Sequence, residues 1–164
     1  MEKFQISKQS ALQRIKAADH MFTQSYLLIG DTKILLAVIN NIYQAIEHCI
    51  TALLQNDRVT RTIPPFHDNF DSKLHVFRNI SARQHNMAEF LPFILAIKEI
   101  EEKHKSSPVE FTRKDSFVIC DDNFSLKVIN AKDVQKFINE AKRLYVAVDS
   151  ETKGVSKILS DEYA

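Results

Sequence analysis

The scarcity of glycine restricts the folds that this chain can adopt more than any other feature of its sequence. Only two glycines, Gly30 and Gly154, occur in 164 residues, and they lie far apart. Phosphate-binding loops of the Walker A and dinucleotide types need several glycines within one turn, so the sequence excludes both. β-architectures with many tight turns also need residues at positive φ, which glycine supplies most easily. The chain is therefore expected to be helical.

The composition is that of an ordinary folded domain. Apolar residues make up 45% and charged residues 26%, which is close to the average of soluble globular proteins. The longest apolar run, Ile34 to Ile39, is too short to cross a bilayer, and the N-terminus has no apolar segment typical of a signal peptide. We expect one domain over residues 1–164, no contact with a membrane and a cytoplasmic location. Cys49 and Cys120 are expected to be free, buried thiols.

Apolar spacing predicts a mainly α fold, an up-and-down helical bundle of about five helices with a small β-hairpin before the last helix. The hairpin is predicted at about residues 116–129, where two β-prone runs flank Asp121-Asp122-Asn123. A frayed, disordered tail is expected over residues 155–164. The predicted helices are Ser7–Leu28, Thr32–Asn56, Asn69–Ile80, Met87–Lys105 and Ala131–Asp149.

The second predicted helix is apolar over most of its circumference, which is typical of the central helix of a bundle. It keeps one polar stripe, in which Asn41, Gln44 and His48 are spaced three and four residues apart. These three side chains are candidates for lining a binding cleft or a small-molecule pocket. The alternative is that the stripe is the solvent-facing edge of an otherwise buried helix.

A basic stretch follows this helix, although the whole chain carries a formal charge of only +1. Arg58, Arg78 and Arg83 are candidates for binding phosphates, because guanidinium groups form bidentate hydrogen bonds with them. The alternative is a solvated surface whose cations pair with nearby acids.

Arg61 and His67 form the one candidate catalytic pair. An arginine close to a histidine can cleave RNA without a metal, because the histidine moves the proton of the 2′-hydroxyl and the arginine stabilises the charged phosphorane. No metal site is predicted, since His67, His75 and His85 are widely spaced and the HExxH motif is absent. No cofactor is predicted either.

The segment AADHMFTQSYLLIGDTKILLAVINNIYQAIEHCITALL, followed by TIPPF and SPVEFTRKDSFVICDDN, resembles small archaeal helical bundles of the HEPN-like superfamily. That resemblance implies a helical bundle that often dimerises. Some members are metal-independent ribonucleases or toxin components with an Arg-x4–6-His motif, and others are non-catalytic binding modules. Arg61 and His67 match the motif's gap, but Pro64 and Pro65 lie between them and the pair follows the second helix rather than opening a late one.

The sequence therefore predicts a non-enzymatic module that binds a protein or nucleic-acid partner and forms a homodimer. The alternative is a metal-independent ribonuclease or toxin-type protein that uses Arg61 and His67.

Overall fold

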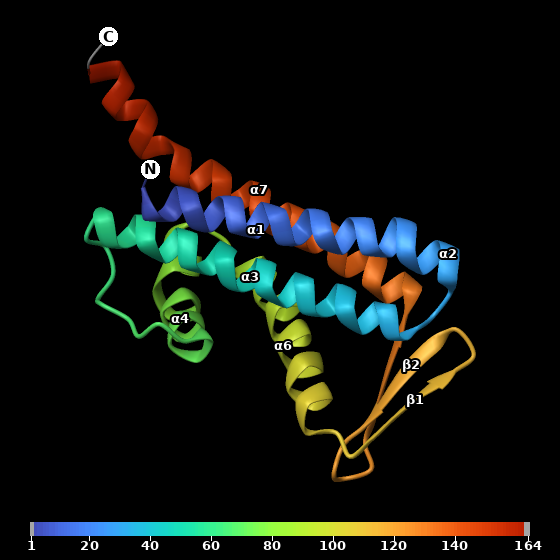
Figure 1. Ribbon diagram of the computed structural model, residues 1–164. Helices are drawn as coiled ribbons and strands as arrows, with labels where there is room; N and C mark the ends of the chain where they lie inside the picture. Colours follow the sequence, from blue (N-terminus) through green and yellow to red (C-terminus); the bar gives the residue numbers. More distant parts are fainter. Residues whose placement is uncertain (1, 163–164) are drawn as a thin grey trace.

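The computed structural model describes residues 2–162, and it describes side chains for residues 2–153. The fold is mainly α. Within the described residues it has five helical segments, α1–α2, α3, α4–α5, α6 and α7, and a small antiparallel sheet before the last of them, which confirms the predicted class (Figure 1). Of the described helices, none is long and apolar enough to cross a membrane. The helices and strands that the next paragraphs use are α1 Lys3–His20, α2 Leu27–Ile29, α3 Lys33–Val59, α4 Phe70–Val76, α5 Ala82–Gln84, α6 Leu91–Ser106, α7 Ala131–Glu162, β1 Val109–Arg113, β2 Ser116–Cys120 and β3 Leu126–Asn130.

Three long helices, α1, α3 and α7, lie along one another, and the shorter α4 and α6 cross beneath them (Figure 1). A π-helical segment, Met21–Tyr26, joins α1 to α2. Gly30 then adopts the left-handed conformation with φ of 70°, which ends α2. The carboxylate of Asp31 accepts a hydrogen bond from the backbone N–H of Lys33 at 2.9 Å and so helps to start α3.

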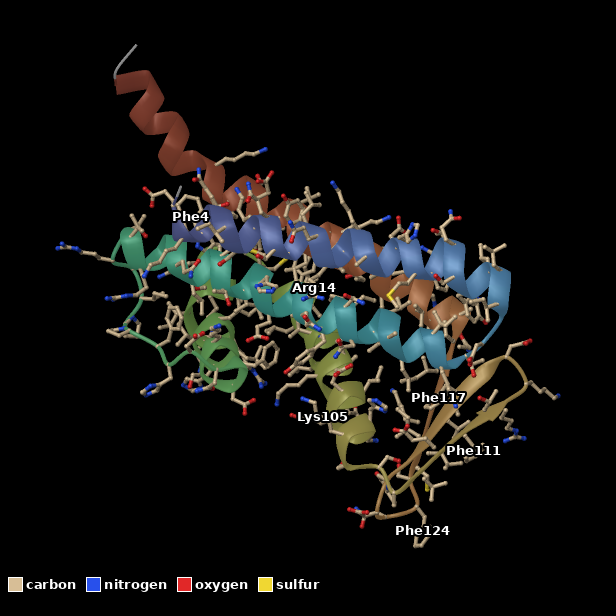
Figure 2. The ribbon with its side chains drawn as sticks, viewed as in Figure 1. Phe4, Arg14, Lys105, Phe111, Phe117 and Phe124 are labelled. Carbon is tan, nitrogen blue, oxygen red and sulfur yellow. The ribbon has the colours of Figure 1, made fainter. Side chains whose placement is uncertain are left out.

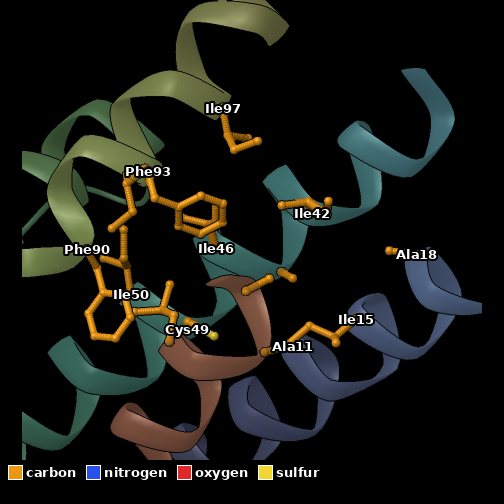
Figure 3. Packing of buried hydrophobic residues seen from close by; sticks show 14 of the residues in the cluster. Ala11, Ile15, Ala18, Ile42, Ile46, Cys49, Ile50, Phe90, Phe93 and Ile97 are labelled. Atoms are coloured by element: carbon orange, nitrogen blue, oxygen red, sulfur yellow. The ribbon is translucent and has the colours of Figure 1, made fainter. Parts of the chain in front are cut away.

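Helix α3 is the centre of the core, as its broad apolar pattern predicts. Its buried side chains contact α1 and α7 on one side and α4 and α6 on the other. Cys49 and Ile50 illustrate this packing, with Phe90 and Phe93 beside them (Figure 3). Burying aliphatic side chains of this size contributes roughly 1.5–3 kcal/mol each. The long helices are therefore held by one continuous core.

Two helices extend beyond their predicted ends. The third one continues from α4 through a π-helical segment, Phe77–Ser81, into α5, so most of the loop expected at residues 81–86 is helical. The last one continues past Asp149 to Glu162. The disordered tail was predicted at residues 155–164. Their side chains lie outside the described ones, and residues 163–164 lie outside the described residues altogether.

The sheet has the strand order β1-β2-β3, and both strand pairs are antiparallel. Strands β2 and β3 are the predicted hairpin, while β1 was not predicted. Its apolar residues, Val109 and Phe111, are both exposed, so the strand lacks the buried alternation that marks a half-buried strand. The sheet lies beyond the start of α3, where the hydroxyl groups of Thr32 and Thr112 are 2.9 Å apart.

Candidate functional site

The C-terminal end of α3 is closed by a turn at Arg61. The backbone N–H of Thr62 donates to the carbonyl of Asp57 at 3.0 Å, and Arg61 between them has φ of 58°. This left-handed position after a helix is most often glycine. The Nη1 of Arg58 donates to the carbonyl of Ile63 at 3.0 Å. Arg58 thus stabilises the turn, and the side chain of Arg61 is left exposed.

A network of charged side chains lies beneath this turn. Asp57 is buried, and its two carboxylate oxygens accept hydrogen bonds from the hydroxyl of Ser81 at 2.6 Å and from the Nε2 of His85 at 2.7 Å. The Nδ1 of His85 lies 2.9 Å from the Oε2 of Glu151 on α7. We call these four residues the His85 clamp. It joins α3, the α4–α5 region and α7, which are remote from one another in the sequence.

The histidine of the clamp is held as a cation. Burial alone lowers the pKa of His85, but the hydrogen bonds to Glu151 and Asp57, together with their negative charges, outweigh burial and raise the pKa above its ordinary value. A neutral imidazole has one N–H and would leave one of the two carboxylates without a donor. Both ring nitrogens of His85 and both carboxylate oxygens of Asp57 are hydrogen-bonded, so the clamp ties the three regions of the chain together.

Three arginines lie on the segments of the chain that flank the clamp residues Asp57, Ser81 and His85. Arg61 lies in the turn after α3, Arg78 in the segment after α4, and Arg83 on α5. The side-chain amide of Gln84 donates to the carbonyl of Thr62 at 3.4 Å, which brings the two segments together. All three guanidinium groups are exposed, and within residues 2–153 none forms an ion pair or a side-chain hydrogen bond. These are uncompensated positive charges at one end of the molecule.

The acids that interrupt the basic stretch are engaged by lysines instead. The buried Nζ of Lys73 lies 2.7 Å from Asp68 and 3.8 Å from Glu47. The Nζ of Lys98 lies 3.3 Å from Asp71. The expectation that cations here pair with nearby acids is therefore met for Lys73, whereas Arg61, Arg78 and Arg83 keep their charge available.

Arg61 and His67 are both exposed and lie at the two ends of the proline-containing loop. His67 lines a hollow of about 370 Å³ together with Asp71 and His75, and Arg61 is not among the residues that line it. No hydrogen bond joins the two side chains in the described structure. The catalytic assignment of this pair stays a prediction.

The polar stripe on α3 forms contacts within the helical layer. The Nδ2 of Asn41 donates to the carbonyl of Ala37 at 3.1 Å and approaches the Sδ of Met21 at 3.3 Å. The Nε2 of Gln44 donates to the Oδ1 of Asn40 at 2.6 Å. His48 is half-buried, and that burial lowers its pKa. A role for the stripe in binding also stays a prediction.

Sequence reasoning missed three members of the clamp, namely Asp57, Ser81 and Glu151. A signal for Asp57 was present, because it continues the buried row Ile46, Ile50 and Leu53 at spacings of four, three and four. A carboxylate on an apolar helix face is expected to have a buried partner. No comparable signal marks Ser81 or Glu151. Within residues 2–153, no group of three or more histidine, cysteine or acidic side chains is arranged to hold a metal.

Comparisons with known protein families, with curated proteins and with solved structures found no match to this chain. The functional argument therefore depends on the geometry of the chain itself. That geometry gives a hydrogen-bonded charged tie at the α3 end of the molecule and exposed arginines that have no ion pair within residues 2–153.

Proposed function

We propose that the protein is a non-enzymatic, homodimeric binding module that holds the phosphate backbone of RNA through Arg61, Arg78 and Arg83. The observation that carries this proposal is that three exposed guanidinium groups on two adjoining segments have no carboxylate partner among residues 2–153. Arginine is suited to phosphate because its planar fork donates two parallel hydrogen bonds.

The His85 clamp supports the same proposal. It fixes the turn that carries Arg61 to the α4–α5 region that carries Arg78 and Arg83, through hydrogen bonds of 2.6 to 2.9 Å. A preorganised set of donors loses less conformational entropy on binding than side chains on separate mobile segments.

Binding of a short single-stranded RNA, measured by fluorescence anisotropy at several salt concentrations, tests the proposal. Replacing Arg61, Arg78 and Arg83 together with alanine is expected to weaken binding at least about tenfold. It is also expected to reduce the slope of log affinity against log salt by about 2, since each phosphate contact on a single strand contributes about 0.7.

A matched control removes the same charge elsewhere. Lys16, Lys132 and Lys136 are exposed and have no ion pair within residues 2–153, so their triple alanine variant keeps the arginine end intact. An equal loss in both variants would show that net charge alone drives binding and would overturn the proposal. Absence of RNA binding at low salt would leave a protein as the partner and would also overturn it.

The rival function is a metal-independent ribonuclease that uses Arg61 and His67. One observation favours it, because Arg61 occupies a strained left-handed conformation next to an exposed loop, and such outliers cluster at functional sites. RNA incubated with the protein in EDTA separates the two functions. Cleavage that persists in EDTA and is lost in His67→Ala would support the ribonuclease, and intact RNA would support the binding module.

A further inference from the structure

The two faces of the sheet have different surroundings. Phe117, Ile119 and Ile129 lie on the inner face and belong to the main core. Val118 points to the opposite face, where it is buried but is not part of that core. Figure 2 shows Phe117 on the side of the sheet nearer the helices and Phe111 on the far side. The outer face therefore has an apolar cluster of its own.

Register shows how this outer cluster is built. Val118 on β2 pairs with Phe111 on β1 and with Val128 on β3, so the three form one row across the sheet. Val109 and Leu126 flank Cys120 in the next row. Phe111, Val128, Val109 and Leu126 expose between 43% and 55% of their surface, and no element of this chain covers them within the described residues.

Phe124 adds an aromatic side chain at the free end of the sheet. It is 87% exposed and has φ of 61°, a left-handed conformation that is rare for a bulky residue. Figure 2 shows it extending away from the helices. An aromatic side chain that is both exposed and held in a strained conformation has the character of an interface anchor.

We propose that the outer face of the sheet, with Phe124, is the interface of the homodimer, and that its occupant is the same face of a second copy of this chain. This inference rests on the dimer in the proposed function and not on RNA binding. From the usual sizes of such side chains, the five residues Val109, Phe111, Phe124, Leu126 and Val128 expose on the order of 500 Å². Two such faces bury about 1,000 Å², which is the lower limit for a specific interface.

Charge distribution identifies the second copy as the occupant. The exposed Arg113 lies at one end of the outer face and the exposed Asp122 at the other, and within residues 2–153 neither has an ion-pair partner. A two-fold axis in the plane between two stacked sheets, perpendicular to the strands, reverses the strand direction. Arg113 of each subunit therefore lies over the Asp122 end of the other subunit. The two symmetry-related pairs make the face complementary to itself.

This arrangement is compatible with the arginine site. The sheet lies at the end of the molecule where α3 begins, and the arginines lie near the end where α3 terminates (Figure 1). A dimer formed through the sheets leaves both arginine sites exposed and far apart. Two tethered sites on one RNA strand would raise the overall affinity by multivalency.

Size-exclusion chromatography with light scattering on the full chain tests the interface. The wild-type protein is expected to be a dimer at micromolar concentration. Val109→Thr, Leu126→Thr and Val128→Thr keep strand-forming side chains, and Phe124→Asn suits the left-handed conformation, so the combined variant is expected to fold and to dissociate at least about tenfold more readily. Circular dichroism checks that it is folded.

Two controls make the test specific. Leu28 on α2 is an apolar residue that is 83% exposed, about as much as Phe124. Leu28→Asn is expected to leave the dimer intact. Arg113→Asp and Asp122→Arg are each expected to weaken the dimer, and the double variant is expected to restore it. A wild-type monomer would overturn both the dimer and this interface. A dimer that persists in the combined sheet variant, or that only Leu28→Asn disrupts, would overturn the interface alone.

Discussion

The two ends of the molecule treat polar and apolar side chains in opposite ways. At the end where α3 terminates, the buried Asp57 is paired within the His85 clamp, and the surface keeps arginines that have no ion pair within residues 2–153. At the sheet end, apolar side chains fill the inner face and a second apolar set is left on the outer face. Burial of charge is specific because each partner must be in place, whereas burial of apolar surface accepts any apolar cover.

Because of this difference, the two ends of the molecule can bind different kinds of partner. Exposed guanidinium groups bind anions with a strong dependence on salt, and an exposed apolar face binds another apolar face with little such dependence. Substitutions at the two ends should therefore affect different properties. Disrupting the clamp should change the stability of the fold, and changing the outer sheet face should change the association of subunits.

The largest expected effect is on the clamp. Asp57→Asn leaves Ser81 and the charged His85 without the buried carboxylate, which we expect to lower the free energy of unfolding by about 3 kcal/mol. Urea unfolding followed by circular dichroism measures it. Asp115→Asn, in the exposed turn between β1 and β2, is the control at the other end and should change stability by less than about 0.5 kcal/mol. Equal effects at the two positions would contradict the contrast.

The next effect is a pH dependence confined to the clamp. The pKa of His85 is raised in the folded state, so the stabilisation is fully present below the unfolded pKa of about 6.5 and is lost as pH rises through the folded pKa. His85→Gln is expected to lower stability by about 2 kcal/mol in mild acid, through loss of charge-assisted hydrogen bonds, and by less in alkali.

Urea titrations of wild type and His85→Gln across this pH range measure the difference. The combined sheet variant serves as the comparison, and its stability difference from wild type should not vary with pH in the same way. A difference for His85→Gln that stays constant from acid to alkali would show that His85 is not held as a cation.

A smaller effect concerns one left-handed residue at each end. Arg61 has φ of 58° and Phe124 has φ of 61°. Glycine adopts this conformation without the steric penalty of a β-carbon, so Arg61→Gly and Phe124→Gly are each expected to raise the stability of the monomer by up to about 1 kcal/mol. Unfolding at protein concentrations below dimer formation measures it. A loss of stability in one variant would show that its side chain contributes packing that outweighs the strain.

Local patterns were enough to predict most of the fold. The apolar spacing of α3 predicted its central position. Strand β1 could not be predicted in this way, because its apolar residues Val109 and Phe111 face outward. The extension of the third helix through Arg83 to Gln84 was also missed, since the polar residues there resemble a loop when their tertiary contacts are unknown.

The candidate site was harder to predict for a physical reason. Arginines can be recognised along the sequence, and the four named there are all exposed without an ion pair within residues 2–153. The clamp joins Asp57 to His85 and His85 to Glu151, residues separated by 28 and 66 positions. Such contacts depend on how whole helices pack, and no local spacing encodes them. The same holds for the outer sheet face, which exists only once β1 pairs with β2.

The smallest expected effect is a difference in reactivity between the two cysteines, one in the core and one on the sheet. Cys49 is fully buried and its pKa is raised by burial to about 12, so it is expected to react with a thiol reagent only through unfolding. Cys120 is half-buried on the outer sheet face and should react faster than Cys49 because it is more accessible. Because a second copy would cover that face, the rate at Cys120 is expected to fall as protein concentration rises, while the rate at Cys49 should not change. Mass spectrometry of labelled peptides measures both rates, with Cys120→Ser as the control for the slow thiol, and a rate at Cys120 that is independent of concentration would argue against the sheet interface.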